Sequence, residues 1–196
     1  MTKKIILGIT GASGAIYGQR ILQALCKEGA DVWLCISDNA RPIIRAELGL
    51  ALDAKKPDLK KFANVKVHYL APGDLSAPPA SGSFPADGMV IAPCSMSTLG
   101  AIASGHGTNL IHRAADVTLK ERRPLVLVAR ETPLSAIHLE NMLRLARLGV
   151  RIVPPMPAFY HGPQTLQDLA RFVVQKIIEQ MGLEFPNPVR WGKGEG

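Results

Sequence analysis

Cysteine, aromatic side chains and long apolar runs are all scarce in this sequence of 196 residues. The three cysteines, Cys26, Cys35 and Cys94, are odd in number and show no CxxC spacing, which argues against a disulfide scaffold or a cysteine-rich zinc site. Aromatic residues make up 5% of the chain, charged residues 20% and hydrophobic residues 47%. This composition indicates a globular protein and excludes a disordered or fibrous one.

Targeting and membrane-spanning segments are missing as well. Lys3 and Lys4 precede an apolar stretch over 5–9, but glycine and hydroxyl residues interrupt it at once. A signal peptide needs an apolar core of about 7–15 residues. No stretch approaches the ~18 apolar residues that a membrane helix needs. We therefore expect a soluble, cytoplasmic protein, and the cysteine usage fits such a reducing compartment.

Positive charge is what the chain has in excess. It carries 23 Lys and Arg against 16 Asp and Glu, a net charge of +7, which favours nucleic acid, a membrane surface or a phosphorylated small molecule as partner. Nucleic acid is disfavoured because no basic run is interleaved with aromatic residues. The histidines form no H-x-x-x-H pair, so we expect no metal site and assign them surface or capping roles.

Short apolar runs alternate with helical periods along the chain. The pattern predicts strands over 4–9, 31–37, 65–70, 88–92, 124–129 and 150–153, and helices over 13–28, 38–48, 95–104, 110–121, 135–148 and 165–181. Strands that are apolar on both faces and alternate with helices indicate a parallel sheet covered on both sides. We therefore predict a single α/β domain over residues 1–196. It has a Rossmann-like (flavodoxin-like) three-layer fold with a mostly parallel sheet, and an extended tail over about 182–196.

A glycine-rich stretch stands where the first predicted strand turns into the first predicted helix. Residues 8–18 read GITGASGAIYG, with Thr10 and Ser13 as hydroxyl donors. Glycines let the backbone approach an anion that faces a helix N-terminus, so the stretch predicts a phosphate cradle; a structural tight turn would use the same residues. The spacing G-x-x-G-x-x-G is neither that of a dinucleotide site nor that of a P-loop. Asp38, near the end of the second strand, still leaves a nicotinamide site open.

Polar residues also follow other predicted strands. The run 95–98 follows the fourth strand, and Arg130 and Glu131 follow the fifth. The carboxyl ends of parallel strands meet at one edge, so these residues point to a ligand crevice there. The run 95–98 could equally cap a helix, and Cys94 fits a small buried thiol better than a nucleophile. Arg113 and Lys120 are seven residues apart and share a helix face, which could also be a merely solvated face.

Six segments spread over the chain match one known family. They are TGASG (10–14), APPASGS (77–83), PCS (93–95), NLIHRAADV (109–117), KERRPLVLV (120–128) and FYH (159–161). With them the chain resembles the UbiX-like flavin prenyltransferases from end to end. The resemblance implies a metal-independent transferase that joins the dimethylallyl group of dimethylallyl phosphate to N5 and C6 of reduced FMN. The product, prenylated FMN, would serve a UbiD-type decarboxylase. The resemblance also implies a homo-oligomer, usually a dodecamer, with sites at subunit interfaces.

The resemblance implies roles for single residues. FMN would be held by Gly11, Ala12, Ser13, Ser37, Ser95, Met96, Ser97, Thr98 and Arg130. The allylic phosphate would meet Ser81, Arg113, Lys120, Arg130, Glu131, Tyr160 and Lys176. Lys176 stands where other members carry arginine, so it keeps the charge and loses the bidentate fork. Catalytic roles would fall to Ser13 near N5, to Glu47 as an acid or base near the flavin, and to Trp191, whose ring can stabilise the allyl cation.

Two alternatives remain open at this point. An FMN-dependent cysteine decarboxylase of the same fold would carry a Pro-x-Met-Asn loop, which residues 155–157 (Pro-Met-Pro) echo only weakly. A non-catalytic FMN carrier would deliver flavin to a decarboxylase, but it leaves the lysine and arginine set for a second phosphate unexplained. Incubation with reduced FMN and dimethylallyl phosphate, without oxygen, distinguishes the transferase from the carrier.

Overall fold

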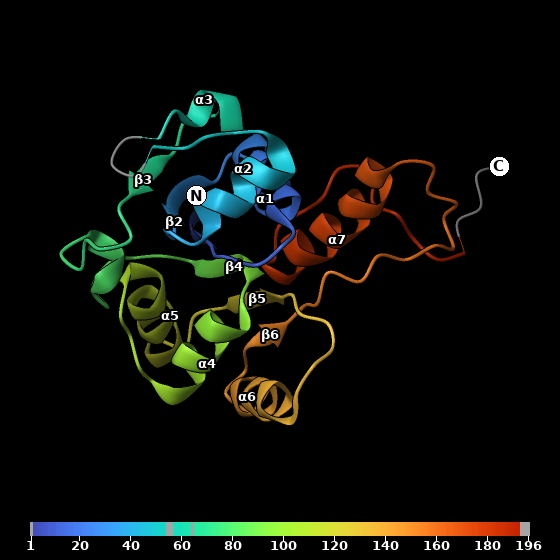
Figure 1. Ribbon diagram of the computed structural model, residues 1–196. Helices are drawn as coiled ribbons and strands as arrows, with labels where there is room; N and C mark the ends of the chain where they lie inside the picture. Colours follow the sequence, from blue (N-terminus) through green and yellow to red (C-terminus); the bar gives the residue numbers. More distant parts are fainter. Residues whose placement is uncertain (1, 54–56, 64, 193–196) are drawn as a thin grey trace.

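A six-stranded parallel sheet organises the computed structural model, which describes residues 2–53, 57–63 and 65–192 (Figure 1). Its strands are β1 (Lys4–Ile9), β2 (Asp31–Ile36), β3 (His68–Leu70), β4 (Gly88–Cys94), β5 (Leu125–Ala129) and β6 (Arg151–Ile152). The order is β3-β2-β1-β4-β5-β6, and every pair is parallel. The strand order reverses between β1 and β4, so the ligand crevice of such a fold lies outside the carboxyl ends of these two strands.

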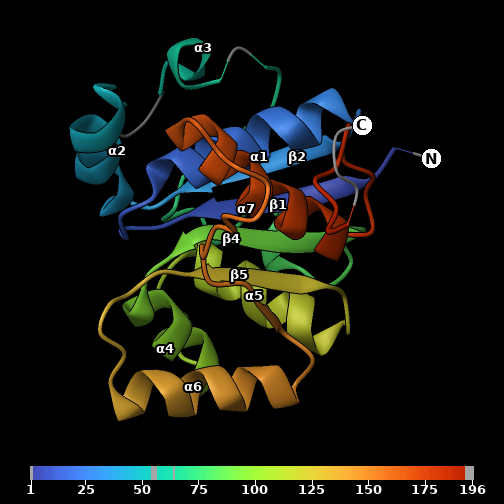
Figure 2. The same ribbon diagram turned by 90° about the vertical axis from the view of Figure 1, so that its right-hand side faces the viewer.

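Helices cover both faces of the sheet (Figure 2). One face carries α1 (Ala15–Lys27), α2 (Ala40–Leu48) and α7 (Leu166–Gln180), and the other carries α4 (Met96–Ser104), α5 (Leu110–Lys120) and α6 (Ala136–Arg147). The predicted three-layer α/β fold is thereby confirmed, with a sheet that is parallel throughout. Two short turns were not predicted, α3 (Leu59–Phe62) and η1 (Pro78–Ala80).

Alternation along the central strands separates two hydrophobic cores. In β1, Ile5, Leu7 and Ile9 pack toward α1, whereas Ile6 packs toward α5. Both sides of the strand are buried, which is why its sequence is a continuous apolar run and not an alternating one. Full burial of one such side chain contributes about 1.5–3 kcal/mol. The two cores therefore hold the strand ends, and the loops that follow them, at fixed positions.

The largest boundary differences from the sequence prediction lie at chain turns and at the edge strands. Helix α1 begins at Ala15 and not at residue 13, because Gly14 takes a left-handed φ of 110° that interrupts the helical path. Strands β3 and β6 are shorter than predicted, and each pairs on one side only, with β2 and β5 respectively. Residues 193–196 of the predicted tail lie outside the described residues.

Candidate functional site

The buried hydroxyl of Thr10 joins the loop after β1 to the loop after β4. Its Oγ1 donates to the carbonyl of Pro93 over 2.8 Å and accepts the N–H of Ser95 over 2.8 Å. Thr10 is 2% exposed. Because the Thr10 hydroxyl already donates its proton to the carbonyl of Pro93, the prediction that it donates to a ligand is wrong. Its role is to hold residues 10–14 beside residues 95–98, at the point where the strand order reverses.

Replacing Thr10 by valine keeps the shape of the side chain and removes both hydrogen bonds. We expect the free energy of unfolding to fall by about 1–3 kcal/mol, because the carbonyl of Pro93 and the N–H of Ser95 lose their partner. Urea denaturation measures the effect as a lower midpoint at unchanged slope. Thr10→Ser keeps the hydroxyl and serves as the control. Equal midpoints for the valine and serine variants would contradict this role of Thr10.

Glu47, from α2, occupies the N-terminus of α1. Its carboxylate accepts the N–H of Gly14 over 3.1 and 3.0 Å, one distance to each oxygen, and the N–H of Ala15 over 2.7 Å. A helix N-terminus attracts negative charge. The carboxylate of Glu47 therefore binds N–H groups of the turn for which the sequence predicts a bound phosphate. Glu47 thus binds the two residues that follow Ser13 in the chain. The catalytic role of Glu47 remains a prediction.

The loop after β2 closes the glycine-rich turn from the other side. A Cβ on Gly11 would lie 2.7 Å from Cβ of Asn39 and 2.8 Å from its carbonyl oxygen, so only glycine fits there. Ser37 donates its N–H to the carbonyl of Ile9 over 2.9 Å. Its hydroxyl oxygen is buried and, within the described part of the chain, has no hydrogen-bond partner. Such a group costs free energy unless a ligand supplies the bond, so Ser37 marks a place for a polar ligand.

Helix α4 begins at the same edge of the sheet. The Ser95 hydroxyl accepts the N–H of Thr98 over 3.3 Å and lies 3.1 Å from its hydroxyl, so Ser95 is the N-cap. The capping role is thereby confirmed, while Ser97 is exposed and able to meet a ligand. The N–H groups of Met96 and Ser97 have no partner within the helix. Cys94 is buried, which confirms the predicted buried thiol, and this burial raises the pKa of the thiol.

A cavity of about 280 Å³ joins the glycine-rich turn to the loop after β5. Ser13, Arg130 and Glu131 line it, together with Tyr17 and Met156. The N–H of Arg130 donates to the carbonyl of Cys94 over 3.1 Å, which fixes the start of this loop beside β4. Ligand pockets begin at about 300 Å³, so the cavity suits one end of a ligand rather than a whole one. The structure thus brings together Ser13, Arg130 and Glu131, as the sequence predicted.

A second group of predicted residues lies along α5 and the η1 turn. Arg113 donates from Nε to the carbonyl of Ala80 over 3.0 Å and pairs with Asp116 at 2.7 Å. Ser81 follows directly on Ala80, and Lys120 pairs with Glu121 at the end of α5. Lys120 precedes β5 and Arg130 follows it, so a strand of about 17 Å separates their backbones. Lys120 and Arg130 of one chain therefore belong to opposite ends of β5.

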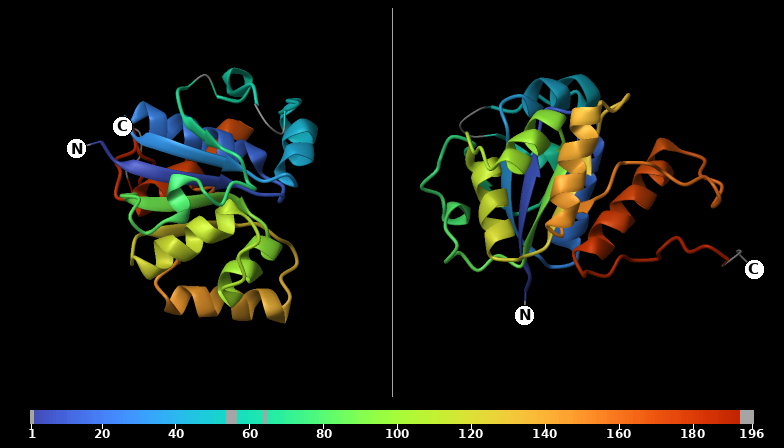
Figure 3. Two further views of the ribbon diagram at one scale, coloured as in Figure 1. Left: turned by 90° about the vertical axis from the view of Figure 1, so that its left-hand side faces the viewer. Right: turned by 90° about the horizontal axis from the view of Figure 1, so that it is seen from below.

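A third group lies on the C-terminal arm, which we define as residues 154–192 including α7. Within this arm, α7 packs against α1, whereas the loop before α7 and the tail after it extend away from the sheet (Figure 3). The ring of Tyr160 contacts that of Trp191 at a centroid distance of 5.0 Å, and Lys176 Nζ lies 5.7 Å from the centroid of Phe172. Trp191 is 79% exposed, whereas the ring nitrogens of His161 are buried without a partner among the described residues. Both features are typical of a surface that another molecule covers.

Sequence reasoning missed two functional groupings, the Thr10 bridge and a polar cluster on α7 around Gln175 and Glu179. Gln175 carried a signal that could have been used, since it stands among the aliphatic positions 173, 174, 177 and 178 of the helix. Burial acts to raise the pKa of Glu179, but hydrogen bonds from Gln175 and Lys176 and the charges of Lys176 and Arg190 outweigh it and lower the pKa. Glu179 therefore stays ionised beside Lys176.

Two histidines bind backbone N–H groups that lie close to them in the chain. His138 completes a capping box with Ser135, and His112 accepts the N–H of Thr108 over 3.3 Å. Within residues 2–53, 57–63 and 65–192, no group of three His, Cys, Asp or Glu could hold a metal ion. The helices among those residues include none long and apolar enough to cross a membrane.

Comparison with known proteins shows the family to which this chain belongs. The profile of the Flavoprotein family matches residues 1–178. The chain is 48% identical over 198 residues to the flavin prenyltransferase UbiX of Pseudomonas aeruginosa, covering 97% of this chain and 95% of that protein. It is 50% identical over 189 residues to the flavin prenyltransferase UbiX of Methanothermobacter thermautotrophicus, covering 96% and 95%. The chain belongs to the UbiX-like flavin prenyltransferases.

Solved structures agree with the UbiX assignment. AnUbiX (PadA1), in complex with FMN and dimethylallyl pyrophosphate, aligns with a TM-score of 0.88 and 43% identity over the whole of both chains. A dodecameric FMN-dependent UbiX-like decarboxylase from Escherichia coli O157:H7 aligns with a TM-score of 0.87 and 47% identity, covering 98% of this chain and 100% of that one. The peptidyl-cysteine decarboxylase EpiD reaches a TM-score of 0.57 at 16% identity, which shows a shared fold alone.

Proposed function

We propose that this UbiX-like protein transfers the dimethylallyl group of dimethylallyl phosphate to N5 and C6 of reduced FMN, which releases phosphate. The observation that carries the proposal is the cavity at the strand-reversal edge, where Ser13 of the glycine-rich turn meets Arg130 and Glu131. Identity of about half over nearly the full length of named flavin prenyltransferases supports the same reaction. Dimethylallyl pyrophosphate, present in a similar structure, is the alternative donor to test.

The residues at this edge suit FMN. Gly11 allows close approach of the backbone, and the buried hydroxyl of Ser37 has an unused hydrogen-bonding capacity. Ser97 presents an exposed hydroxyl at the N-terminus of α4, where unpaired N–H groups favour the negative charge of a phosphate. We assign FMN binding to these groups and to their neighbours Ala12, Ser13, Ser95, Met96, Thr98 and Arg130. Reduced FMN, when bound, supplies the nucleophilic ring atoms N5 and C6.

Cations of the chain stabilise the leaving group. Breaking the C–O bond of an allylic phosphate develops negative charge on the phosphate, and fixed cations lower the barrier to that step. Arg130 stands at the cavity, while Lys120 and Lys176 lie on α5 and on the C-terminal arm. We propose that neighbouring subunits bring these groups, with Ser81, Arg113 and Tyr160, to one phosphate. A homo-oligomer such as a dodecamer, the assembly described for the similar Escherichia coli structure, supplies these neighbours.

The remaining roles concern the proton and the allylic carbon. Glu47 holds the turn that presents Ser13 to the cavity, and its carboxylate is a base for the proton lost from C6. Ser13 is placed to assist proton movement near N5. Trp191 stands on the C-terminal arm with its ring exposed, so that it can face a cationic carbon in a neighbouring subunit's site.

Incubation with reduced FMN and dimethylallyl phosphate, without oxygen, tests the proposed function. Mass spectrometry of the bound flavin is expected to show a gain of one prenyl unit. Retention of unmodified flavin would instead favour a carrier. Two solved structures that are 47% and 44% identical to this chain carry decarboxylase names, and the second is a phenylacrylic acid decarboxylase from Aquifex aeolicus. Release of CO₂ from phenylacrylic acid, without any prenylation, would therefore favour a decarboxylase.

The product needs a recipient outside this chain. We propose a UbiD-type decarboxylase, because prenylated FMN is the cofactor that such enzymes use. We also propose that the transfer takes place in the cytoplasm, since the three cysteines are free, as expected in a reducing compartment. Co-expression with a UbiD-type enzyme tests the delivery. The UbiD-type enzyme is purified, and mass spectrometry of its bound flavin shows whether it has received prenylated FMN.

A further inference from the structure

Gln175 is a fully buried amide in the middle of α7, with 0% exposure. Its Oε1 accepts the N–H of Val189 over 2.7 Å, and its Nε2 donates to the carbonyl of Val189 over 3.1 Å. Nε2 also lies 3.0 Å from Oε1 of Glu179. A single side chain thus binds both backbone groups of one tail residue, as a neighbouring strand would. Buried amides are costly without such partners, so these bonds fix the tail at this residue.

Other side chains of α7 bind the tail on either side of Val189. Arg171 donates from one nitrogen to the carbonyls of Pro186 and Asn187, over 3.0 and 2.7 Å. Glu179 pairs with Arg190 at 3.5 Å and with Lys176 at 3.3 Å. The tail is therefore bound along α7 from residue 186 to residue 190, and Gln175 forms the buried centre of this attachment.

Two residues beyond Val189 stands Trp191. Its ring meets Tyr160 edge-on, at 5.0 Å between centroids and 84° between planes, and 79% of Trp191 is exposed. Most of Trp191 is thus free of contact with the described residues, and the backbone attachment to α7 lies directly before it. We propose that Gln175 is the positioning residue that places Trp191 beside Tyr160 for the allylic donor. The proposal deepens the proposed function and rests on it for the role of Trp191.

The identity of residue 175 distinguishes positioning from simple packing. Its neighbours on the buried face of α7, Val174, Ile177 and Ile178, are aliphatic, and a leucine would satisfy the same core. An amide carries an acceptor and a donor side by side, so it can bind the N–H and the carbonyl of Val189 together, whereas leucine can bind neither. A shift of the tail by one residue along α7 would break both bonds, so the amide selects one register and thereby one position for Trp191.

Replacing Gln175 by leucine, in a Trp33→Phe background that leaves Trp191 as the single tryptophan, tests the proposal. In the assembled, FMN-loaded protein we expect the fluorescence anisotropy decay of Trp191 to lose its slow component. We also expect kcat/KM for dimethylallyl phosphate to fall about tenfold or more, because small misplacements of a positioned group are costly. FMN affinity should change less than about twofold, within 0.4 kcal/mol. If the leucine variant does not fold, Gln175→Met repeats the test, because methionine is unbranched like glutamine and lacks the amide.

Gln167→Leu makes the same change at an exposed position of the first turn of α7 and is the matched control. It should leave both the anisotropy and the kinetics unchanged. An unaltered anisotropy decay in both Gln175 variants overturns the proposal. A mobile Trp191 with unaltered kcat/KM overturns it as well, since position would then not matter. If the parent protein forms no prenylated flavin, the proposed function fails, and the anisotropy decay still decides whether Gln175 positions Trp191.

Discussion

Replacing Arg130 by alanine is expected to lower kcat/KM for prenylated FMN formation by about 10²–10³-fold. Arg130 directly follows β5 and lines the cavity together with Ser13. Its backbone N–H donates to the carbonyl of Cys94, which fixes its position. Removal of the charge leaves the developing phosphate charge less stabilised and disturbs neither hydrophobic core, because Arg130 is exposed and lies outside both. Initial rates of flavin prenylation over a range of dimethylallyl phosphate concentrations measure the loss.

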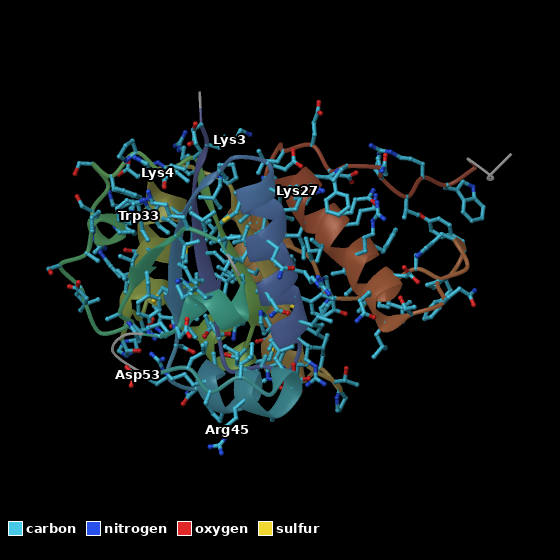
Figure 4. The ribbon with its side chains drawn as sticks, turned by 90° about the horizontal axis from the view of Figure 1, so that it is seen from above. Lys3, Lys4, Lys27, Trp33, Arg45 and Asp53 are labelled. Carbon is cyan, nitrogen blue, oxygen red and sulfur yellow. The ribbon has the colours of Figure 1, made fainter. Side chains whose placement is uncertain are left out.

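Arg45→Ala is the control for this substitution. Arg45 lies on the exposed side of α2, and its side chain points away from the body of the molecule (Figure 4). The net charge changes equally in both variants, so a general electrostatic effect would appear in both. Arg130→Lys keeps the charge without the fork and is expected to recover part of the rate. Activity of Arg130→Ala within threefold of the parent, about 0.7 kcal/mol, would remove Arg130 from the site.

Gly18→Ala is expected to reduce the free energy of unfolding by about 2–3 kcal/mol. Gly18 lies on the face of α1 that packs against the sheet, and a Cβ there would be 2.6 Å from the carbonyl oxygen of Ala92 and 3.0 Å from Cδ1 of Ile9. The first contact is with the backbone of the central strand β4, which cannot move without disturbing its neighbours β1 and β5. Helix α1 must therefore shift, and the Ser13 turn before it shifts too. Urea denaturation measures the loss.

Gly100→Ala is the matched control, because it adds the same methyl group to another helix, α4. The nearest atom to a Cβ at Gly100 is Nδ2 of Asn141 at 3.6 Å, which is an ordinary contact. We expect this variant to be more stable by about 0.5–1 kcal/mol, the usual gain of alanine over glycine within a helix. Opposite signs for the two substitutions would confirm that close packing, and not helix propensity, decides the effect at Gly18. Equal effects would contradict it.

The sequence could predict the position of a site residue only where that residue directly follows a strand of the sheet. Ser13, Arg130 and Glu131 follow β1 and β5, so the parallel sheet alone brings them to one edge, and the cavity joins them. Lys120 and Lys176 could be assigned a role by family resemblance but not a place. Lys120 lies at the end of α5, before the start of β5, and Lys176 lies on the C-terminal arm. Their assembly with Arg130 stays a prediction about neighbouring subunits.

By itself the sequence determined the three-layer α/β fold and the family. Strands buried on both faces must be continuous apolar runs, and helices between them must be amphipathic, so both are visible residue by residue. Only the tertiary structure decided that Glu47 fills the N-terminus of α1, that Ser37 keeps an unpaired hydroxyl, and that Gln175 binds Val189. Each of these depends on how elements distant in the chain come to lie against each other. A hydrogen bond acts over about 3 Å, so local pattern cannot reveal its partner.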